Sequence, residues 1–263
     1  MTRHVPQFDL SRILRDTSVQ HVEYHPTLTS TSTVAAELLG PLLNQAPSLV
    51  LTDEQTAGRG RKGNLWWSTA GALTFSLVLK ASEVPMAAER RPLIALAAGL
   101  AVRTALAELA PGFEFFVKWP NDVLTGAQKI CGILVEQQGA DDQQGLIIGI
   151  GINVNNSLRE APAEVAQRAT SLFDLCGQSF ELTDVLIRVL QQLDFRISQF
   201  VTQPRLALSE VNRVSLLSGR TVTVLSGDVS MTGHCIGIDE DGQLVLQTEQ
   251  GLVRCATGIV QQW

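Results

Sequence analysis

Residues 129–154, KICGILVEQQGADDQQGLIIGIGINV, carry the pattern that decides the fold. Residues 129–137 and 146–154 are apolar runs, and the polar, glycine-containing segment 138–145 separates them. Two apolar runs around such a segment predict a β-hairpin, and continuously apolar strands are typical of the buried interior of a sheet. This hairpin therefore indicates the centre of a sheet.

Segments on both sides of the hairpin predict further strands and long helices. We expect strands at 48–52, 73–79 and 113–119, and helices at 32–43, 86–109 and 181–201. Gly40 and Pro41 are expected to break the first helix, and Pro92 lies in the first turns of the second. Thr183 is expected to cap the third helix. The pattern predicts an α+β fold in which helices flank a mixed sheet.

The chain changes character after Val211, where helical signals stop and short strands begin. These strands are expected at 220–225, 234–238, 244–247 and 252–256. About fifty residues of closely spaced strands are typical of a small β-barrel. We therefore predict two domains, 1–211 and 212–263.

Composition and charge narrow the class of protein. The net charge of −6 argues against general affinity for DNA or for an anionic membrane surface. The apolar stretches are too short or too interrupted to span a bilayer, and residues 1–16 lack the apolar core of a signal peptide. The four cysteines are scattered, as reduced thiols are, and the four histidines form no zinc-binding cluster. We expect a cytoplasmic protein.

The most informative functional segment is a basic, glycine-rich loop at residues 58–63, GRGRKG, which Trp66 and Trp67 follow. Glycines let the backbone approach a ligand closely, and planar guanidinium groups suit phosphate or carboxylate oxygens. Three cations on one loop of an acidic protein therefore indicate an anionic ligand. A solvated basic loop and a hook for the DNA minor groove are the alternatives, whereas the spacing of a P-loop is absent.

Two further segments supply polar groups. Lys129 begins an apolar strand, where an ammonium group is costly to bury unless an anion pairs with it. Asn121 and Asp122 offer an amide and a carboxylate in an expected turn, although ordinary turn chemistry is the alternative. The glycines of the segment 149–155, GIGINVN, indicate either a bulge in a buried strand or the close approach of a ligand.

In this order, the segments resemble those of biotin protein ligases, also called biotin–carboxylase ligases. The matching landmarks are Ser30-Thr31-Ser32, Gln55 with residues 58–61, and residues 118–122, 129–136 and 151–153. The resemblance runs from about Ser30 to Asn155. It implies a catalytic domain like those of class II synthetases and lipoate ligases, followed by a small SH3-like β-barrel.

The resemblance implies an enzyme that uses ATP and biotin as substrates, with Mg²⁺. Biotin attacks the α-phosphate of ATP, which gives biotinyl-AMP and pyrophosphate. A lysine of a biotin carboxyl carrier domain, part of a biotin-dependent carboxylase, then attacks the activated carbonyl and releases AMP. Two anions must meet in the first step, so cationic groups are needed to offset their repulsion.

The resemblance also implies roles for individual residues. Lys129 bridges the biotin carboxylate and the phosphate, Arg59 closes over both, and Asp122 accepts a proton from the acceptor lysine or holds magnesium. The residues expected at biotin are Ser30, Thr31, Ser32, Gln55, Arg59, Gly60, Arg61, Trp66 and Lys129. Those expected at ATP are Arg59, Arg61, Lys118, Asn121 and Asn153.

Two positions depart from the family pattern: Ser32 replaces the usual asparagine, and Asn64 stands where some members carry arginine. About thirty residues precede Ser30, fewer than the roughly sixty of a helix-turn-helix module, so we expect the short form without DNA or membrane binding. A lipoate or octanoate ligase of related fold, and a non-catalytic biotin-responsive repressor, are the alternatives. The oligomeric state, a homodimer included, stays open.

Overall fold

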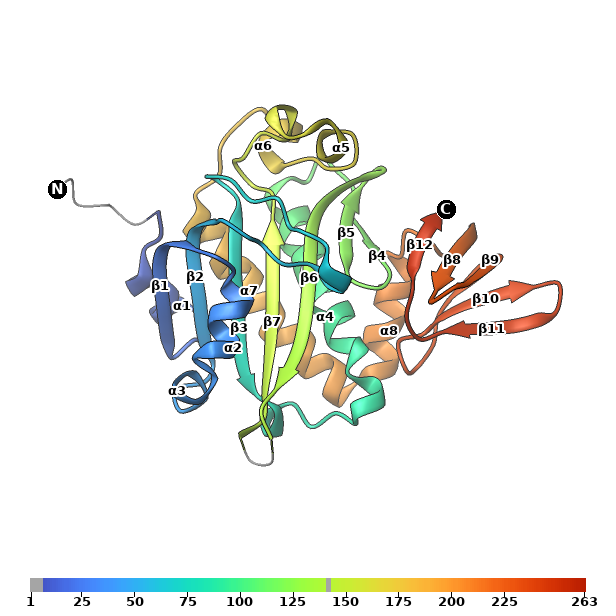
Figure 1. Cartoon of the computed structure of the whole chain (residues 1–263), viewed down its shortest axis with the longest axis horizontal. Helices are drawn as coiled ribbons and strands as arrows, with labels where there is room; N and C mark the ends of the chain where they lie inside the picture. The colour runs from blue at the N-terminus through green and yellow to red at the C-terminus, as the bar shows by residue number, and fades with distance from the viewer. Residues whose placement is uncertain (1–6, 141–142) are drawn as a thin grey trace.

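The computed structural model describes residues 7–140 and 143–263, which form a seven-stranded mixed sheet, its helices and a smaller β unit (Figure 1). The large sheet has the order β1-β2-β3-β7-β6-β5-β4, in which β1 and β2 are parallel and the other neighbours are antiparallel. Its strands are β1 (His21–Leu28), β2 (Ser48–Gln55), β3 (Leu73–Lys80), β4 (Phe116–Lys118), β5 (Asp122–Thr125), β6 (Gln128–Gln138) and β7 (Gly145–Ile152). The α+β class with a mixed sheet is confirmed.

The expected central hairpin is present as β6 and β7. β7 lies between β6 and β3, and every one of its residues is buried. Alternate residues serve two different cores: Ile148 and Ile150 belong to the main core, whereas Ile147 belongs to a smaller one on the opposite face. The run is continuously apolar because both faces of the strand are covered.

Helices cover the two faces of the sheet unequally. α4 (Pro92–Leu109) and α7 (Leu182–Thr202) lie behind the sheet in the view of Figure 1, and α2 (Thr31–Glu37) and α3 (Leu39–Leu43) lie on the other face. The remaining helices are α1 (Leu10–Asp16), α5 (Ala163–Ala166), α6 (Leu172–Cys176) and α8 (Pro204–Arg213). The second face is therefore only partly covered by helices, and the loop between β2 and β3 crosses the rest of it (Figure 1).

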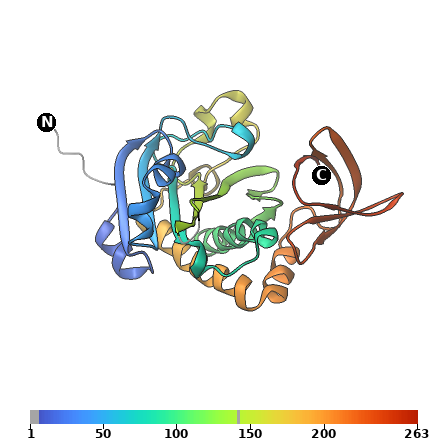
Figure 2. The same ribbon diagram turned by 60° about the horizontal axis from the view of Figure 1, so that its bottom comes forward.

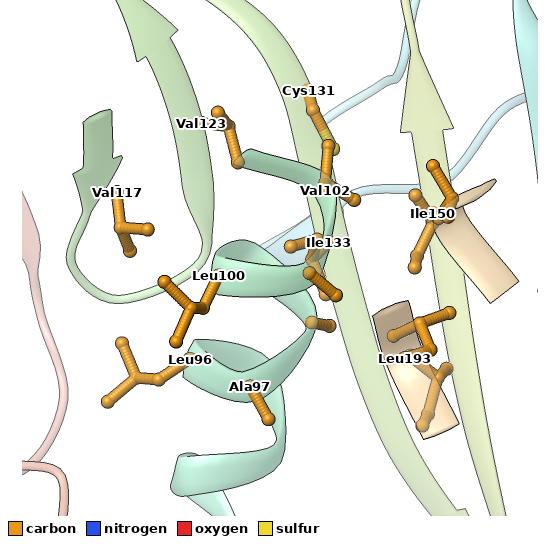
Figure 3. Packing of buried hydrophobic residues seen from close by; sticks show 14 of the residues in the cluster. Leu96, Ala97, Leu100, Val102, Val117, Val123, Cys131, Ile133, Ile150 and Leu193 are labelled. Carbon is orange, nitrogen blue, oxygen red and sulfur yellow. The ribbon is translucent and has the colours of Figure 1, made fainter. Parts of the chain in front are cut away.

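α4 is the central helix of the main core. In Figure 3, Leu96 and Leu100 lie on the side of α4 nearer Val117, and Ile133 lies on its other side; all four side chains are buried. The helix is long and apolar enough, by length and composition alone, to cross a membrane, but 61% of it is buried inside the fold. It therefore has the burial of a core helix.

Three details of the helices differ from expectation. The first predicted helix is two helices, α2 and α3, and the break falls at Leu38 rather than at Gly40-Pro41, because Pro41 is tolerated within the first turn of α3. The second helix begins at Pro92 itself. The third is capped by Glu181, whose carboxylate accepts from the backbone N–H of Thr183 and Asp184, so Thr183 is not the cap.

The C-terminal unit is a five-stranded antiparallel sheet of the order β11-β10-β9-β8-β12. Its strands are β8 (Thr221–Ser226), β9 (Val229–Ile238), β10 (Leu244–Thr248), β11 (Gly251–Cys255) and β12 (Ile259–Gln262). α8 was not expected, and the predicted boundary at 211/212 falls inside it. The boundary stays a prediction.

The C-terminal unit is attached to the β4 edge of the large sheet, next to α8 (Figure 2). The indole Nε1 of Trp119 donates to the carbonyl oxygen of Gly242 at 3.0 Å. The side chain of Asn212 in α8 bonds both the N–H and the carbonyl of Ile238. Trp119 is 2% exposed, so this joint is anchored by a buried ring as well as by hydrogen bonds.

Candidate active site

A cavity of about 190 Å³ lies on the partly covered face of the sheet, over β6 and β7. Its walls come from the loop between β2 and β3, the start of α2, the turn between β4 and β5, and β12. It brings together the predicted residues Ser30, Thr31, Ser32, Gln55, Arg59, Gly60, Arg61, Trp66, Lys118, Asn121, Asp122 and Lys129. Asn64, one of the two departures, also lines it.

The basic loop is an ordered miniature hairpin. The N–H of Gly60 donates to the carbonyl of Asn64 at 2.7 Å, and the N–H of Trp66 donates to that of Gly58 at 2.8 Å. Lys62 sits at its turn with a φ of 54°, a left-handed conformation uncommon for a side chain larger than glycine. This loop therefore has a defined fold over the sheet.

The floor of the cavity is the ring of Trp66 lying on two glycines. Gly132 in β6 and Gly151 in β7 are paired across the hairpin. A Cβ added at Gly151 would lie 2.4 Å from the indole ring, and one at Gly132 would lie 3.2 Å from it. A side chain at position 151 would therefore displace the ring, and one at position 132 would crowd it. Within the described residues, the buried Nε1 of Trp66 has no acceptor.

One end of the cavity is neutral and internally hydrogen-bonded. Gln55 Oε1 accepts from the N–H of Thr31 at 2.8 Å, and Ser76 Oγ donates to Thr31 Oγ1 at 2.9 Å. Ser32 Oγ lies 3.0 Å from Ser76 Oγ. Ser32 fits there because position 149 is glycine: a Cβ would come within 2.4 Å of the Ser32 hydroxyl.

The other end is charged. Lys129 Nζ lies 2.6 Å from Asp122 Oδ1, and 5.7 Å from the centre of the Trp66 ring. Arg61 Nη1 donates to Asn121 Oδ1 at 3.2 Å. Asn121 is itself held, since its Nδ2 donates to the carbonyl of Ile133 at 2.6 Å. Burial lowers the pKa of Arg61, although a guanidinium stays protonated.

Arg59 and Lys118 have partners outside the predicted set. Arg59 Nη2 pairs with Glu136 Oε1 at 2.7 Å. Lys118 Nζ lies 3.4 Å from the centre of the Trp263 ring. Burial lowers the pKa of Lys118 to about 8; nearby Asp122 opposes this shift and Lys129 adds to it.

Asn153 does not line the cavity. Its Nδ2 donates to the carbonyl of Thr170 at 3.0 Å, and its Oδ1 accepts from Asn156 Nδ2 at 3.1 Å. The side chain is 2% exposed and ties the end of β7 to the segment before α6. Its expected contact with the adenine region stays a prediction, and the contacts seen here are structural.

A metal cage is not part of the cavity. No group of three or more His, Cys, Asp or Glu residues that could hold an ion is found in residues 7–140 and 143–263. Mg²⁺ that arrives with ATP needs only one or two protein carboxylates, since the phosphates and water supply the other ligands. Asp122 is the carboxylate that lines the cavity, and it is already paired with Lys129.

Comparison with known proteins places this arrangement in a family. Residues 24–153 match the Biotin/lipoate A/B protein ligase family, and residues 217–262 match the Biotin protein ligase C terminal domain. The bifunctional ligase/repressor BirA of Bacillus subtilis is 35% identical over 240 residues, which cover 89% of this chain and 71% of that protein. The biotin–[acetyl-CoA-carboxylase] ligase of Mycobacterium tuberculosis is 35% identical over 216 residues, covering 81% of this chain and 77% of that protein.

A solved structure shows the same fold with ligands. The biotin protein ligase from Aquifex aeolicus in complex with biotin and ATP superposes with a TM-score of 0.79 at 29% identity, covering 93% of this chain and 100% of that one. This chain therefore belongs to the biotin/lipoate A/B protein ligase family. The match of its C-terminal unit places it in the biotin protein ligase branch of that family.

Proposed function

We infer that this chain is a biotin protein ligase, which activates biotin with ATP and transfers it to a lysine of an acceptor protein. The observation that carries this function is the position of Lys129. Its ammonium lies at the charged end of the cavity, 2.6 Å from Asp122 Oδ1 and 5.7 Å from the centre of the Trp66 ring. A cation beside the floor of the cavity is suited to hold a carboxylate against a phosphate, which is the encounter that acyl-adenylate formation requires.

In the first step, a biotin carboxylate oxygen forms a bond to the α-phosphorus of ATP, and the bond to the bridging oxygen breaks to release pyrophosphate. Lys129 and Arg61 offset the charge on the carboxylate and the phosphate. Trp66 forms the apolar floor under the biotin rings, and its buried Nε1–H is a donor for a polar atom of the ligand. Bound Mg²⁺ would supply charge neutralisation on the phosphates, with Asp122 nearest to hold it.

The neutral end suits the ureido group of biotin. That group is uncharged and both donates and accepts hydrogen bonds, and hydroxyl groups can do the same. Thr31 and Ser32 present hydroxyls there, both are linked to the buried hydroxyl of Ser76, and Gln55 Oε1 accepts from the N–H and the hydroxyl of Thr31. A charged side chain at this end would face an uncharged ligand without a partner, so the absence of charge among these lining residues fits biotin.

In the second step, the amine of the acceptor lysine attacks the carbonyl carbon and AMP leaves. The amine must lose a proton, and Asp122 is the nearest carboxylate to the reacting end of the cavity. The loop hairpin covers the cavity and excludes water, which would otherwise hydrolyse the mixed anhydride.

The acceptor we propose is a biotin carboxyl carrier domain, because relatives carry the name biotin–[acetyl-CoA-carboxylase] ligase. A cytoplasmic location and a homodimer are further proposals. The name of the Bacillus subtilis relative describes that protein as a repressor as well as a ligase. A gel shift with the promoter DNA of biotin genes, at physiological salt, tests whether this chain binds such DNA; we expect no specific complex.

The function is tested by incubating the protein with ATP, Mg²⁺, biotin and a biotin carboxyl carrier domain, then locating the modified lysine by mass spectrometry. We expect biotin on one lysine, dependent on both ATP and biotin. Pyrophosphate release is measured in parallel with biotin and with lipoate. Release with lipoate but not with biotin would reject biotin as the substrate in favour of a lipoate ligase.

A further inference from the structure

The C-terminal unit contributes directly to the wall of the cavity. Gly258, Ile259 and Val260, at the start of β12, line it. The pairing of β12 with β8 shifts register between Val260 and Gln262. Such an irregularity redirects the side chains that follow it. The residue that follows is Trp263, whose ring reaches Lys118 in the catalytic sheet.

The contact is one cation facing one ring. Lys118 Nζ lies 3.4 Å from the centre of the Trp263 ring, which is within the range of a cation–π interaction. Lys118 ends β4 and lines the same cavity as Lys129. The two lysines differ in their partners: Lys129 is paired with the carboxylate of Asp122, whereas Lys118 rests on an uncharged ring.

That difference has a chemical consequence. A carboxylate partner neutralises an ammonium, but an aromatic face only orients it, because the ring carries a quadrupole and no net charge. Lys118 is therefore held in one place while its full positive charge remains available to an anion. In this cavity the anion that needs a second, unneutralised cation is the triphosphate of ATP.

We propose that Trp263 is a positioning residue for ATP: its ring holds the ammonium of Lys118 at the cavity wall, where phosphate oxygens bind it. The proposal rests on the proposed function. It assigns the C-terminal unit a direct task in the first half-reaction, and the joint between Trp119 and Gly242 keeps that unit at the distance the contact requires. Removal of the ring would leave Lys118 several rotamers to lose when ATP binds.

The test compares Trp263→Leu, which removes the ring, with Trp263→Phe, which keeps one, in biotin-dependent ATP–pyrophosphate exchange. We expect Trp263→Leu to raise KM for ATP about three- to tenfold and to leave KM for biotin unchanged. Trp263→Phe should retain most of the wild-type KM for ATP. Leu252→Ala is the matched control, because Leu252 is an exposed apolar residue of the same unit, in β11, and does not line the cavity.

The same change in a Lys118→Gln variant distinguishes a role of Trp263 in positioning Lys118 from a role in packing. In Lys118→Gln, the change Trp263→Leu should have no further effect on KM for ATP, since the ring has no ammonium to hold. An equal effect of Trp263→Leu in both backgrounds, or an unchanged KM in the wild-type background, overturns the proposal. Exchange by the wild-type protein is the reference: its failure would reject the ligase function, whereas a failed Trp263 comparison with active wild type rejects only the positioning role.

Discussion

The two ends of the cavity are built on opposite principles. At the neutral end, the hydroxyls of Thr31, Ser32 and Ser76 bond to one another, and all three side chains are buried. At the charged end, Lys129 is held by the carboxylate of Asp122, with which an incoming anion must compete. The hydrogen bonds of the neutral end are therefore formed before the ligand binds, whereas the ion pair at the charged end must be exchanged for contacts with the ligand. Specificity for the ligand is therefore expected from the first end, and chemistry from the second.

The largest expected effect is at Lys129, in the charged end. Lys129→Ala should reduce adenylate formation by about 10³-fold, because it removes the cation between carboxylate and phosphate and leaves Asp122 as an unpaired negative charge beside them. Biotin-dependent pyrophosphate release measures the effect, and retention of the fold is checked by circular dichroism. Adenylate yield like that of the wild type would remove Lys129 from the mechanism.

The next effect tests whether the neutral end depends on shape. Gly151→Ala places a Cβ about 2.4 Å from the Trp66 ring and must displace it. We expect KM for biotin to rise roughly 10- to 100-fold, with a smaller change in KM for ATP. Gly112→Ala is the control, because a Cβ there meets no atom within 4 Å. An unchanged KM for biotin would mean that Trp66 is not the floor of the biotin site.

A smaller effect is expected at Arg59, the residue of the basic loop that pairs with Glu136. Arg59→Ala removes the pair with Glu136 and one cation from the loop. We expect free biotinyl-AMP in solution to increase about tenfold, with less change in the affinity for ATP, because the loop closes less tightly over the anhydride. Chromatography of the reaction mixture measures released adenylate. If release does not increase, the loop is not the cover.

The smallest effect is a dependence on pH at the charged end. Burial lowers the pKa of Lys118 to about 8. The side chain is therefore positively charged below that pH and loses its charge as the pH rises through it. The groups that face it are Asp122, Lys129 and the Trp263 ring. We expect kcat/KM for ATP to fall about three- to tenfold between roughly pH 7 and pH 9. Lys118→Arg should flatten that fall, since arginine stays charged; an equal fall in both proteins assigns it to another group.

The sequence predicted those site residues that lie within short, recognisable segments. The basic loop, Lys129 and the Asn121-Asp122 turn were each found from a short segment, and the resemblance set them in one order. Ser76 was not identified, because its alternation with Leu77 in β3 is equally typical of a surface strand. In the structure Thr74 and Ser76 are buried, and Ser76 contacts the cavity residues Thr31 and Ser32.

Contacts between distant parts of the chain were the least predictable. Glu136 lay within a recognised motif, but its pairing with Arg59 depends on how a loop crosses the sheet 77 residues away. Trp263 reaches Lys118 through the joint of two sheets, which no spacing in the sequence encodes. The fold was predictable in its centre for the converse reason, since β6 and β7 are neighbours in the chain and their apolar pattern is continuous.

The glycines under Trp66 also bear on the thermodynamics of folding. Gly132, Gly149 and Gly151 lie in the two central strands, where glycine weakens a sheet and supplies no side chain at these three positions of the cavity face. Packing on the opposite face, by α4 and α7, must hold the sheet together. A ligand on the glycine face would add the missing layer of contacts, and because it binds only the folded chain it would raise the melting temperature. During each catalytic cycle the bound substrate therefore supplies packing contacts that the chain itself does not provide at these glycines.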